Sequence, residues 1–238
     1  MNKDIAQAQE DNSLTLNYNK WVFELIAPYL KDRVLDAGCG AGNFIRYMLD
    51  KKVIVACDVE SFFLEAVKKN YGSFSHVHAY KCDIQDKGII GICAGYSVDS
   101  VICNNVLEHV PDDIKALENA CSILPAGGVM ALIVPAVPCL YNKWDAAVGH
   151  MRRYSKAEVI DKLSRSGFRV KKAFYINMLG MAAWFINGAV LGNTPASSLS
   201  IQRQAVFFDR YMVRPIRALE SAVGVPIGQS IIAIAYKD

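Results

Sequence analysis

The sequence predicts a single α/β domain built on a doubly wound, mostly parallel sheet of seven strands. Short apolar runs alternate with helical patterns over residues 30–176, which implies right-handed crossovers between parallel strands. The first apolar run ends in a glycine-rich turn at residues 36–42, and a last apolar run occupies residues 230–236. With 238 residues, 53% of them hydrophobic, the chain can bury one full core.

Each element follows from its local pattern. Ser155 and Glu158 form a predicted capping box at the start of the helix expected over residues 156–166, and Gly167 ends that helix. The expected helices span residues 14–30, 43–49, 61–69, 112–123 and 156–166. The expected strands span residues 34–36, 53–57, 76–81, 98–103, 129–134, 169–176 and 230–236.

The glycine-rich turn predicts a ligand that resembles a nucleotide but carries no phosphate. Gly38 and Gly40 allow the backbone to turn sharply and to approach a ligand closely. A pyrophosphate fingerprint needs a third glycine at the sixth position, where this chain has Asn43. Asp36 would also repel a pyrophosphate, whereas it would attract an amino group.

Two further acids follow strands of the same sheet. Asp58 ends the second strand about twenty residues after Gly38, the position at which an acid accepts ribose hydroxyls. Asp83 follows the third strand, where a carboxylate could accept a hydrogen bond from the amino group of adenine. Each acid taken alone could be an ordinary helix cap or turn residue. Together they would meet at the carboxyl edge of the strands, where ligands of open α/β sheets bind.

The run Asp-x-Gly-x-Gly-x-Gly at residues 36–42 resembles motif I of the class I methyltransferases that use S-adenosylmethionine. Residues 104–110 and 124–128 resemble later motifs of that family in the expected order. The resemblance implies a Rossmann-like methyltransferase sheet and S-adenosylmethionine as cofactor. Trp21, which resembles a residue that covers the cofactor in one subgroup of the family, could equally pack in the protein core. The cofactor residues that the resemblance implies are Tyr18, Trp21, Asp36, Gly38, Gly40, Asp58, Val59, Asp83, Ile84, Asn104 and Asn105.

Residues 135–154 concentrate aromatic, acidic, imidazole and guanidinium groups in one loop after the fifth strand. His150 is the preferred general base, because imidazole titrates near the working pH. Asp145 could orient it or take the proton itself, and the pair could instead only fasten the loop. His109 is expected to pack or cap behind the fourth strand. The run Asp-x4-His-x-Arg-Arg-Tyr also resembles a segment of a broad methyltransferase subgroup whose substrates vary.

The same loop supplies the expected acceptor-binding residues. Arg152 and Arg153 offer forked donors to a carboxylate or phosphate, or to the cofactor's own carboxylate, or could pair with an acid such as Glu108. Tyrosine rings could surround a sulfonium through cation–π attraction. We assign a catalytic role to Tyr141 and substrate contacts to Asn142, Arg153, Tyr154 and Tyr175.

Roughly fifty residues separate the last two strands, far more than a hairpin loop needs. We expect residues 177–229 to form a helical lid insertion within one domain that spans 1–238. The segment 178–191 is apolar but too short to span a bilayer. It is interpreted as a buried lid helix, as a peripheral membrane contact next to flanking arginines, or as a dimer contact.

Composition and charge restrict the partners, cellular location and metal content that we expect of the protein. A net charge of +3 without a clustered basic run predicts no nucleic-acid partner, and the polar N-terminus predicts a cytoplasmic protein. The seven cysteines show no metal-finger spacing, so no metal site is expected.

Three functions are weighed. The leading one is transfer of a methyl group to an oxygen, nitrogen or carbon atom of a small, partly apolar acceptor. The second keeps the cofactor but releases methylthioadenosine, either by cyclisation to azetidine-2-carboxylate or by aminocarboxypropyl transfer. The third is a non-catalytic scaffold that retains a nucleotide pocket.

Overall fold

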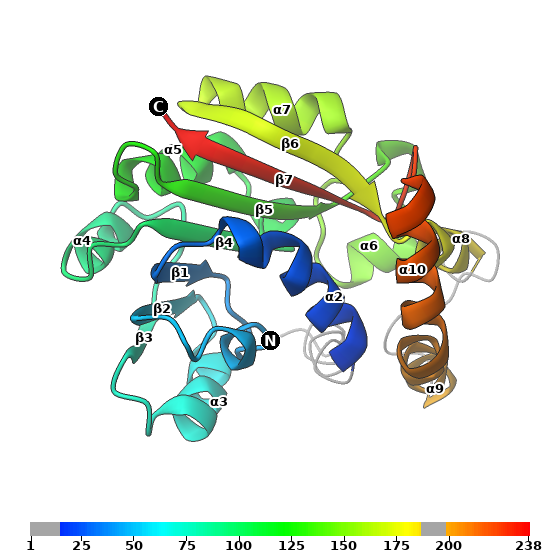
Figure 1. The fold of residues 1–238 in the computed structure, drawn as a ribbon, viewed down its shortest axis with the longest axis horizontal. Coiled ribbons are helices and arrows are strands. Elements are labelled where there is room, and N and C mark those ends of the chain that lie inside the picture. Colours follow the sequence, from blue (N-terminus) through cyan, green and yellow to red (C-terminus); the bar gives the residue numbers. More distant parts are fainter. Residues whose placement is uncertain (1–14, 187–198) are drawn as a thin grey trace.

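The computed structural model describes residues 15–186 and 199–238. Within this part of the chain, seven strands form one sheet in the order β3-β2-β1-β4-β5-β7-β6 (Figure 1). β7 runs antiparallel to both of its neighbours, and the other pairs are parallel. The predicted fold class is confirmed. The strands are β1 Arg33–Ala37, β2 Val53–Asp58, β3 Val77–Lys81, β4 Ser100–Asn104, β5 Val129–Pro135, β6 Phe168–Ile176 and β7 Ser230–Lys237.

The helices alternate with the strands as far as β6. The α-helices are α2 Leu16–Ile26, α3 Ser61–Tyr71, α4 Gly88–Ala94, α5 Asp113–Ile123, α6 Lys143–Ala147, α7 Lys156–Arg165, α8 Met178–Phe185, α9 Leu199–Phe207 and α10 Val213–Val223. Short 3₁₀ turns are η1 Ala27–Tyr29, η2 Ile45–Tyr47, η3 Leu107–His109 and η4 Pro138–Leu140, and the π-helical turn η7 Phe208–Met212 joins α9 to α10.

The helix predicted over residues 43–49 is wrong. Only the 3₁₀ turn η2 forms there, because Gly42 has a left-handed φ of 81° and the chain turns again before β2. A segment this short gains too few hydrogen bonds to offset the cost of starting a helix. The short helices α4 and α6 are absent from the sequence prediction. Ser155 caps α7 by accepting a bond from the Glu158 N–H, and Gly167 follows this helix with φ 88°.

Apolar side chains fill both faces of the sheet, as expected for strands covered by helices on each side. Successive residues of β1 alternate between the two layers, with Leu35 on one face and Val34 on the other. α4, α5 and α7 cover the face of Leu35, and α2, α3 and α10 cover the face of Val34. The sheet is therefore a rigid support whose carboxyl edge carries the polar residues.

The described parts of the insertion between β6 and β7 are mainly helical, and α8, α9 and α10 lie together at one end of the sheet (Figure 1). Asp209 fastens it to α2 by accepting bonds from the N–H groups of Asn17 and Tyr18, at 3.1 and 2.8 Å. Glu220 accepts the N–H groups of Asn177 and Met178, which begin α8. Residues 187–191 of the predicted contact segment lie outside the described residues.

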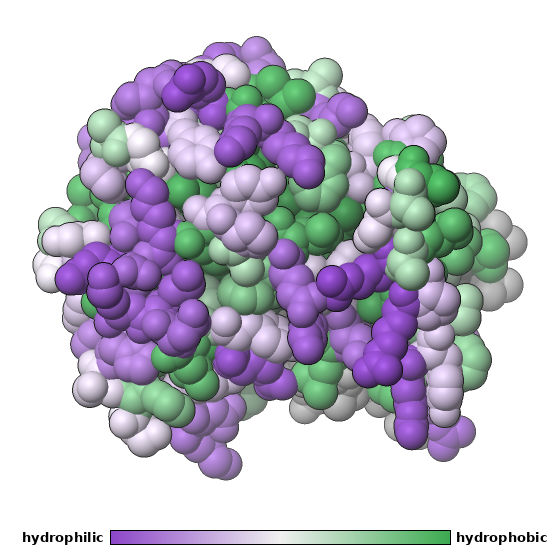
Figure 2. Space-filling view, viewed as in Figure 1, coloured by the Kyte–Doolittle hydropathy of each residue, from purple (hydrophilic) through white to green (hydrophobic). Residues whose placement is uncertain are grey.

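The outer surface of α8 is apolar. Leu179, Phe185 and Ile186 are exposed, and hydrophobic residues gather over this helix in the space-filling view (Figure 2). Among the described residues, no helix has the length and apolar character that crossing a bilayer requires.

Candidate cofactor site and active site

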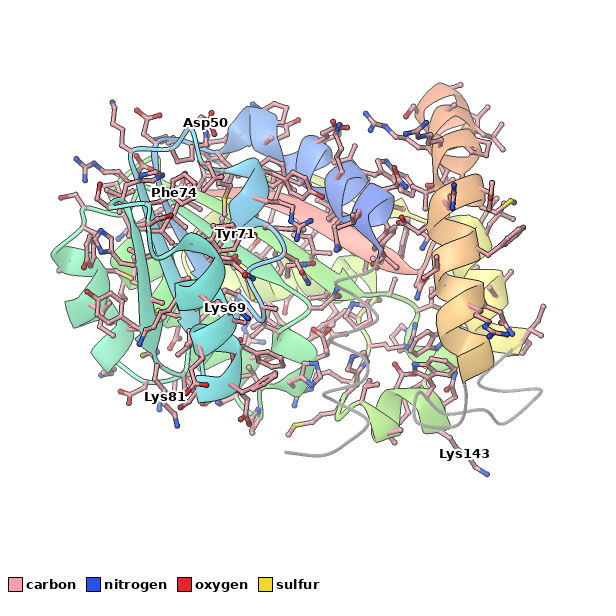
Figure 3. All side chains as sticks on the ribbon, turned by 90° about the horizontal axis from the view of Figure 1, so that it is seen from below. Asp50, Lys69, Tyr71, Phe74, Lys81 and Lys143 are labelled. Atoms are coloured by element: carbon pink, nitrogen blue, oxygen red, sulfur yellow. The ribbon has the colours of Figure 1, made fainter. Side chains whose placement is uncertain are left out.

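The turn after β1 is built from three glycines with left-handed backbone conformations. Gly38, Gly40 and Gly42 have φ values of 72°, 50° and 81°. The N–H of Gly38 donates to Cys57 O at 2.8 Å, and the Tyr71 hydroxyl donates to Gly42 O at 3.3 Å. Tyr71 lies at the end of α3 (Figure 3). These bonds join the turn to β2 and α3, so the turn is preorganised.

Gly38 is required for two separate reasons, its φ and its contact with Val106. A Cβ atom built on Gly38 would lie 2.2 Å from Val106 Cγ2. Gly127 has a similar φ of 70° but meets no atom within 4 Å, so it is a matched control. We expect Gly38→Ala to abolish measurable cofactor binding in isothermal titration, whereas Gly127→Ala should retain it and lose only about 1 kcal/mol of stability through backbone strain. Equal binding by both variants would contradict this account of the turn.

A small polar pocket opens at the carboxyl ends of β1 and β4. Two predicted cofactor residues that follow β4, Asn104 and Asn105, lie across it from the glycine turn. The pocket is lined by Asp36, Gly38, Cys39, Gly40, Asn43, Phe44, Asn104 and Asn105. The structure therefore brings together five residues singled out from the sequence. Cys39, Asn43 and Phe44 are additional, and their place inside or beside the glycine run could have indicated them.

The carboxylate of Asp36 is the unusual group in this pocket. The side chain is 3% exposed, and no hydrogen bond to its carboxylate is found among the described residues. Burial, and then the nearby charge of Asp58, raise the pKa of Asp36 to about 7. A buried acid without a partner would be stabilised by a cation, so the pocket fits a ligand that carries a positive amino group.

Asp58 and Asp83 end β2 and follow β3, as predicted, but both already accept bonds from the backbone. Asp58 accepts from the N–H groups of Gly40 and Glu60, each at 2.9 Å, and burial raises the pKa of Asp58. Asp83 accepts from the N–H of Gln85 at 2.8 Å. Each carboxylate still has lone pairs for a ligand, because a carboxylate offers about four acceptor sites.

The two apolar residues predicted beside these acids differ in exposure. The Val59 side chain is 51% exposed and can cover a flat ligand. Ile84 is 4% exposed and belongs to the core, where its carbonyl accepts a bond from the Asn119 amide. The packing of the Ile84 side chain in the core leaves it little surface to offer to a cofactor.

The two predicted cofactor residues of α2 face inward. Trp21 is 2% exposed and packs in the core layer of α2, α3 and α10, so core packing is the reading that the structure supports. Burial raises the pKa of the Tyr18 hydroxyl, which lies near Ser230 and Asn177 where β7 meets the insertion. Neither residue lines the pocket at the glycine turn.

The loop after β5 is organised around one buried carboxylate. Asn142 and Asp145 form a reciprocal capping box that starts α6, while Lys143 at the first turn projects away from the protein (Figure 3). Asp145 is fully buried and accepts bonds from His150 Nδ1 at 2.8 Å and from Arg153 Nε at 2.9 Å. This arrangement holds the imidazole in one orientation.

Asp145 remains ionised in this setting. Burial alone would raise the pKa of Asp145, but the bonds from His150 and Arg153 outweigh it and lower the pKa. A carboxylate so strongly bound to two donors is a poor proton acceptor. Of the two roles considered for Asp145, orienting His150 fits the structure, and accepting the acceptor's proton does not.

His150 lies among further titratable groups. Its Nε2 is 3.8 Å from Oε1 of the fully buried Glu108, beyond hydrogen-bond distance. Its ring meets the ring of His109 edge-on, with centroids 4.8 Å apart. Burial, and then His150, lower the pKa of His109 to about 4, and burial raises the pKa of Glu108 to about 7. His109 is therefore neutral at pH 7 and donates from Nδ1 to Gly149 O at 3.1 Å.

Two of the predicted substrate contacts, Tyr154 and Arg153, are buried side chains and need correction. Tyr154 is 1% exposed, and its hydroxyl donates into the core to Leu107 O and Asp113 at 3.0 Å. Arg153 is 4% exposed and is bound to Asp145, and its guanidinium stacks over the Trp184 ring at 4.7 Å. These two side chains hold the loop in place, because they have no surface left for an acceptor.

Tyr175 and Tyr141 also have partners. Lys156 Nζ lies 5.4 Å from the centre of the Tyr175 ring, so a cation of the protein already occupies that face. Tyr141 is 41% exposed, and its hydroxyl donates to His150 O at 2.8 Å. Its hydroxyl therefore fastens the His150 backbone, and its ring remains open to a ligand.

The order of strands, the reversed β7 and the glycine turn define the class I methyltransferase fold. A family model described as "Methyltransferase domain" matches residues 7–173. A curated relative, the ubiquinone biosynthesis O-methyltransferase of Haemophilus ducreyi, is 29% identical over 103 residues. That match covers 42% of this chain and 44% of the relative, so the chain spans less than half of the relative's length.

Solved structures share the fold at low sequence identity. A putative methyltransferase of Haloferax volcanii, solved in complex with the Trm112 methyltransferase activator, has a TM-score of 0.64 at 17% identity, covering 99% of this chain and 98% of that one. A putative sarcosine dimethylglycine methyltransferase from Galdieria sulphuraria has a TM-score of 0.60 at 15% identity, covering 94% and 86%. The [4+2]-cyclase SpnF has a TM-score of 0.60 at 16% identity, covering 93% and 80%.

The chain belongs to the methyltransferase-domain family. Its fold is that of the class I methyltransferases, and the S-adenosylmethionine cofactor that the glycine turn predicts fits this family.

Proposed function

We propose that this enzyme transfers a methyl group to a hydroxyl oxygen of a small, partly apolar acceptor. The observation that carries the proposal is the pairing of His150 with Asp145, at 2.8 Å, in the loop that follows β5. A hydroxyl must lose its proton as it is methylated, so it needs such a base. The oxygen-directed activity named for the Haemophilus ducreyi relative supports the same choice.

The residues divide into two groups in this proposal. Asp36 binds the amino group of the cofactor, and Asn104 and Asn105 complete the wall opposite the glycine turn. S-adenosylmethionine supplies, when bound, a methyl group on a positively charged sulfur. Holding the acceptor beside that methyl group lowers the activation free energy by on the order of 7–11 kcal/mol.

His150 removes the acceptor's proton at Nε2. Asp145 fixes Nδ1–H as the donor and stabilises the imidazolium that forms, and Arg153 keeps Asp145 ionised. General-base assistance of this kind contributes about 10²–10⁴-fold to the rate. The helical insertion 177–229, placed beside α2 through Asp209, is the proposed lid over the acceptor.

Product analysis tests the proposal. The purified protein would be incubated with methyl-labelled S-adenosylmethionine and a panel of small phenols and aliphatic alcohols, and the products separated by mass spectrometry. We expect S-adenosylhomocysteine together with a labelled methyl ether. Methylthioadenosine as the nucleoside product would replace the proposal with cyclisation to azetidine-2-carboxylate or aminocarboxypropyl transfer. A methylated amine or carbon would change the acceptor atom.

A further inference from the structure

The carboxylate of Glu108 is buried without a partner. The residue is 0% exposed, and neither of its side-chain oxygens has a hydrogen-bond partner in the described part of the chain. Leaving such a group unpaired is costly. Two imidazole rings, those of His109 and His150, lie beside this carboxylate, and a fourth component would complete the group.

The three side chains present their donor atoms to one another. One ligand atom each from Glu108, His109 and His150 lies within 4.8 Å of the other two. Zn²⁺ holds nitrogen and oxygen ligands at about 2.0–2.2 Å, which places donors about 3.4 Å apart in a tetrahedral site. His150 Nε2 lies 3.8 Å from Glu108 Oε1, so modest side-chain rotation would close the group around an ion.

The outer contacts of both imidazoles are those of metal-binding histidines. Asp145 accepts from His150 Nδ1, and the carbonyl of Gly149 accepts from His109 Nδ1. A ligating histidine typically donates its second ring N–H to a carboxylate or backbone carbonyl, which fixes the tautomer and the ring orientation. In both residues, Nε2 is therefore the nitrogen that keeps its lone pair for a ligand.

We propose that Glu108, His109 and His150 form a site for one divalent transition-metal ion, of which Zn²⁺ is the best match. Two imidazole nitrogens and one carboxylate oxygen suit zinc and its neighbours, whereas Mg²⁺ and Ca²⁺ prefer oxygen ligands. Three protein ligands leave one position open. The site joins η3 to the loop after α6, two segments far apart in the sequence. It contains no cysteine, so the cysteine spacing from which we expected no metal site could not have indicated it.

Occupancy has a chemical consequence. An ion bound to His150 Nε2 uses the lone pair that a general base needs, so the ion-loaded protein cannot deprotonate an acceptor at this atom. The metal site is a property separate from the proposed methyl transfer, and ion binding to it can be measured without turnover.

The test is equilibrium dialysis of chelator-treated full-length protein against Zn²⁺, with metal counted by mass spectrometry. We expect one Zn²⁺ per chain. Glu108→Gln and His109→Gln should each weaken binding by more than the roughly 10–100-fold that loss of an outer partner causes. His78→Gln is the matched control, because His78 lies on β3 against Tyr96, and it should bind like the unchanged protein.

Two results would overturn the site: no bound Zn²⁺ in the unchanged protein, or equal binding by the Glu108 and His109 variants. Thermal melts and cofactor titrations check that these variants fold. If they do not fold, anomalous diffraction from crystals of the unchanged protein grown with Zn²⁺ decides the matter. An ion on these three residues supports the proposal, and an ion only on the cysteines contradicts it. Loss of Zn²⁺ binding with methyl transfer intact would leave the proposed function standing.

Discussion

Asp36→Asn is expected to weaken binding of S-adenosylmethionine and, above pH 7, to stabilise the cofactor-free protein. A hydrogen bond to a charged group is worth about 1.5–3 kcal/mol, so affinity should fall about 10–100-fold. The opposite effect on stability follows from burial, which raises the pKa of Asp36 to about 7 because ionisation in this pocket is costly without the cofactor.

The sign of the pH dependence is fixed by that raised pKa. Because the folded protein binds the Asp36 proton more tightly than the unfolded chain does, this stabilisation is fully present below about pH 4 and is lost as the pH rises through about 7. Asparagine cannot ionise. The melting temperatures of the two proteins should therefore separate as the pH rises from 4 to 8, with the variant the more stable.

Calorimetry supplies the binding half of this test. The affinity of the unchanged protein for S-adenosylmethionine should rise between pH 6 and 8, with release of a proton on binding, whereas the variant should show neither effect. Asp50→Asn is the control, because Asp50 is exposed in the loop before β2 (Figure 3). If Asp36→Asn bound the cofactor as tightly as the control does, Asp36 would not be the cation site.

His150→Ala is expected to lower kcat by about 10²–10⁴-fold in chelator-treated enzyme, because the acceptor would lose its base. Cofactor affinity should change little, since His150 does not line the pocket at the glycine turn. Transfer to an acceptor that ionises on its own near neutral pH should be affected much less. That difference between acceptors distinguishes a base from a residue that merely supports the loop.

Asp145→Asn is the companion change. It should also slow turnover, and it should destabilise the fold, because Arg153 would then be a buried charge without its partner. Removing one member of a buried ion pair costs about 3–5 kcal/mol. Thermal melts separate the two effects, with His78→Gln as a second control. Unchanged kcat in a folded His150→Ala enzyme would remove His150 from the reaction.

The cofactor half of the site was predictable because its residues follow a local rule. Asp36 and Asn104 each stand where a buried strand ends, and parallel strands bring their carboxyl ends to one edge. Trp21 shows the limit of the rule. Its place on an amphipathic helix does not tell whether the apolar face meets a ligand or the core, and the tertiary packing puts it in the core.

The loop after β5 was harder to interpret, because every polar side chain in it has several chemical uses. The sequence shows that Arg153 and Tyr154 are adjacent, but not that Arg153 turns to Asp145 while Tyr154 turns to Asp113. Long-range pairs such as Glu108 with His150 depend on how two loops pack, and no local pattern encodes that packing.

The position of β7 has a consequence for biosynthesis. This strand pairs with β5 and β6, yet the whole insertion must be synthesised between β6 and β7. Until β7 leaves the ribosome, β5 and β6 have open edges that can pair with other chains. We therefore infer that the nascent protein passes through an aggregation-prone stage that lasts until residues 230–237 pair with β5 and β6.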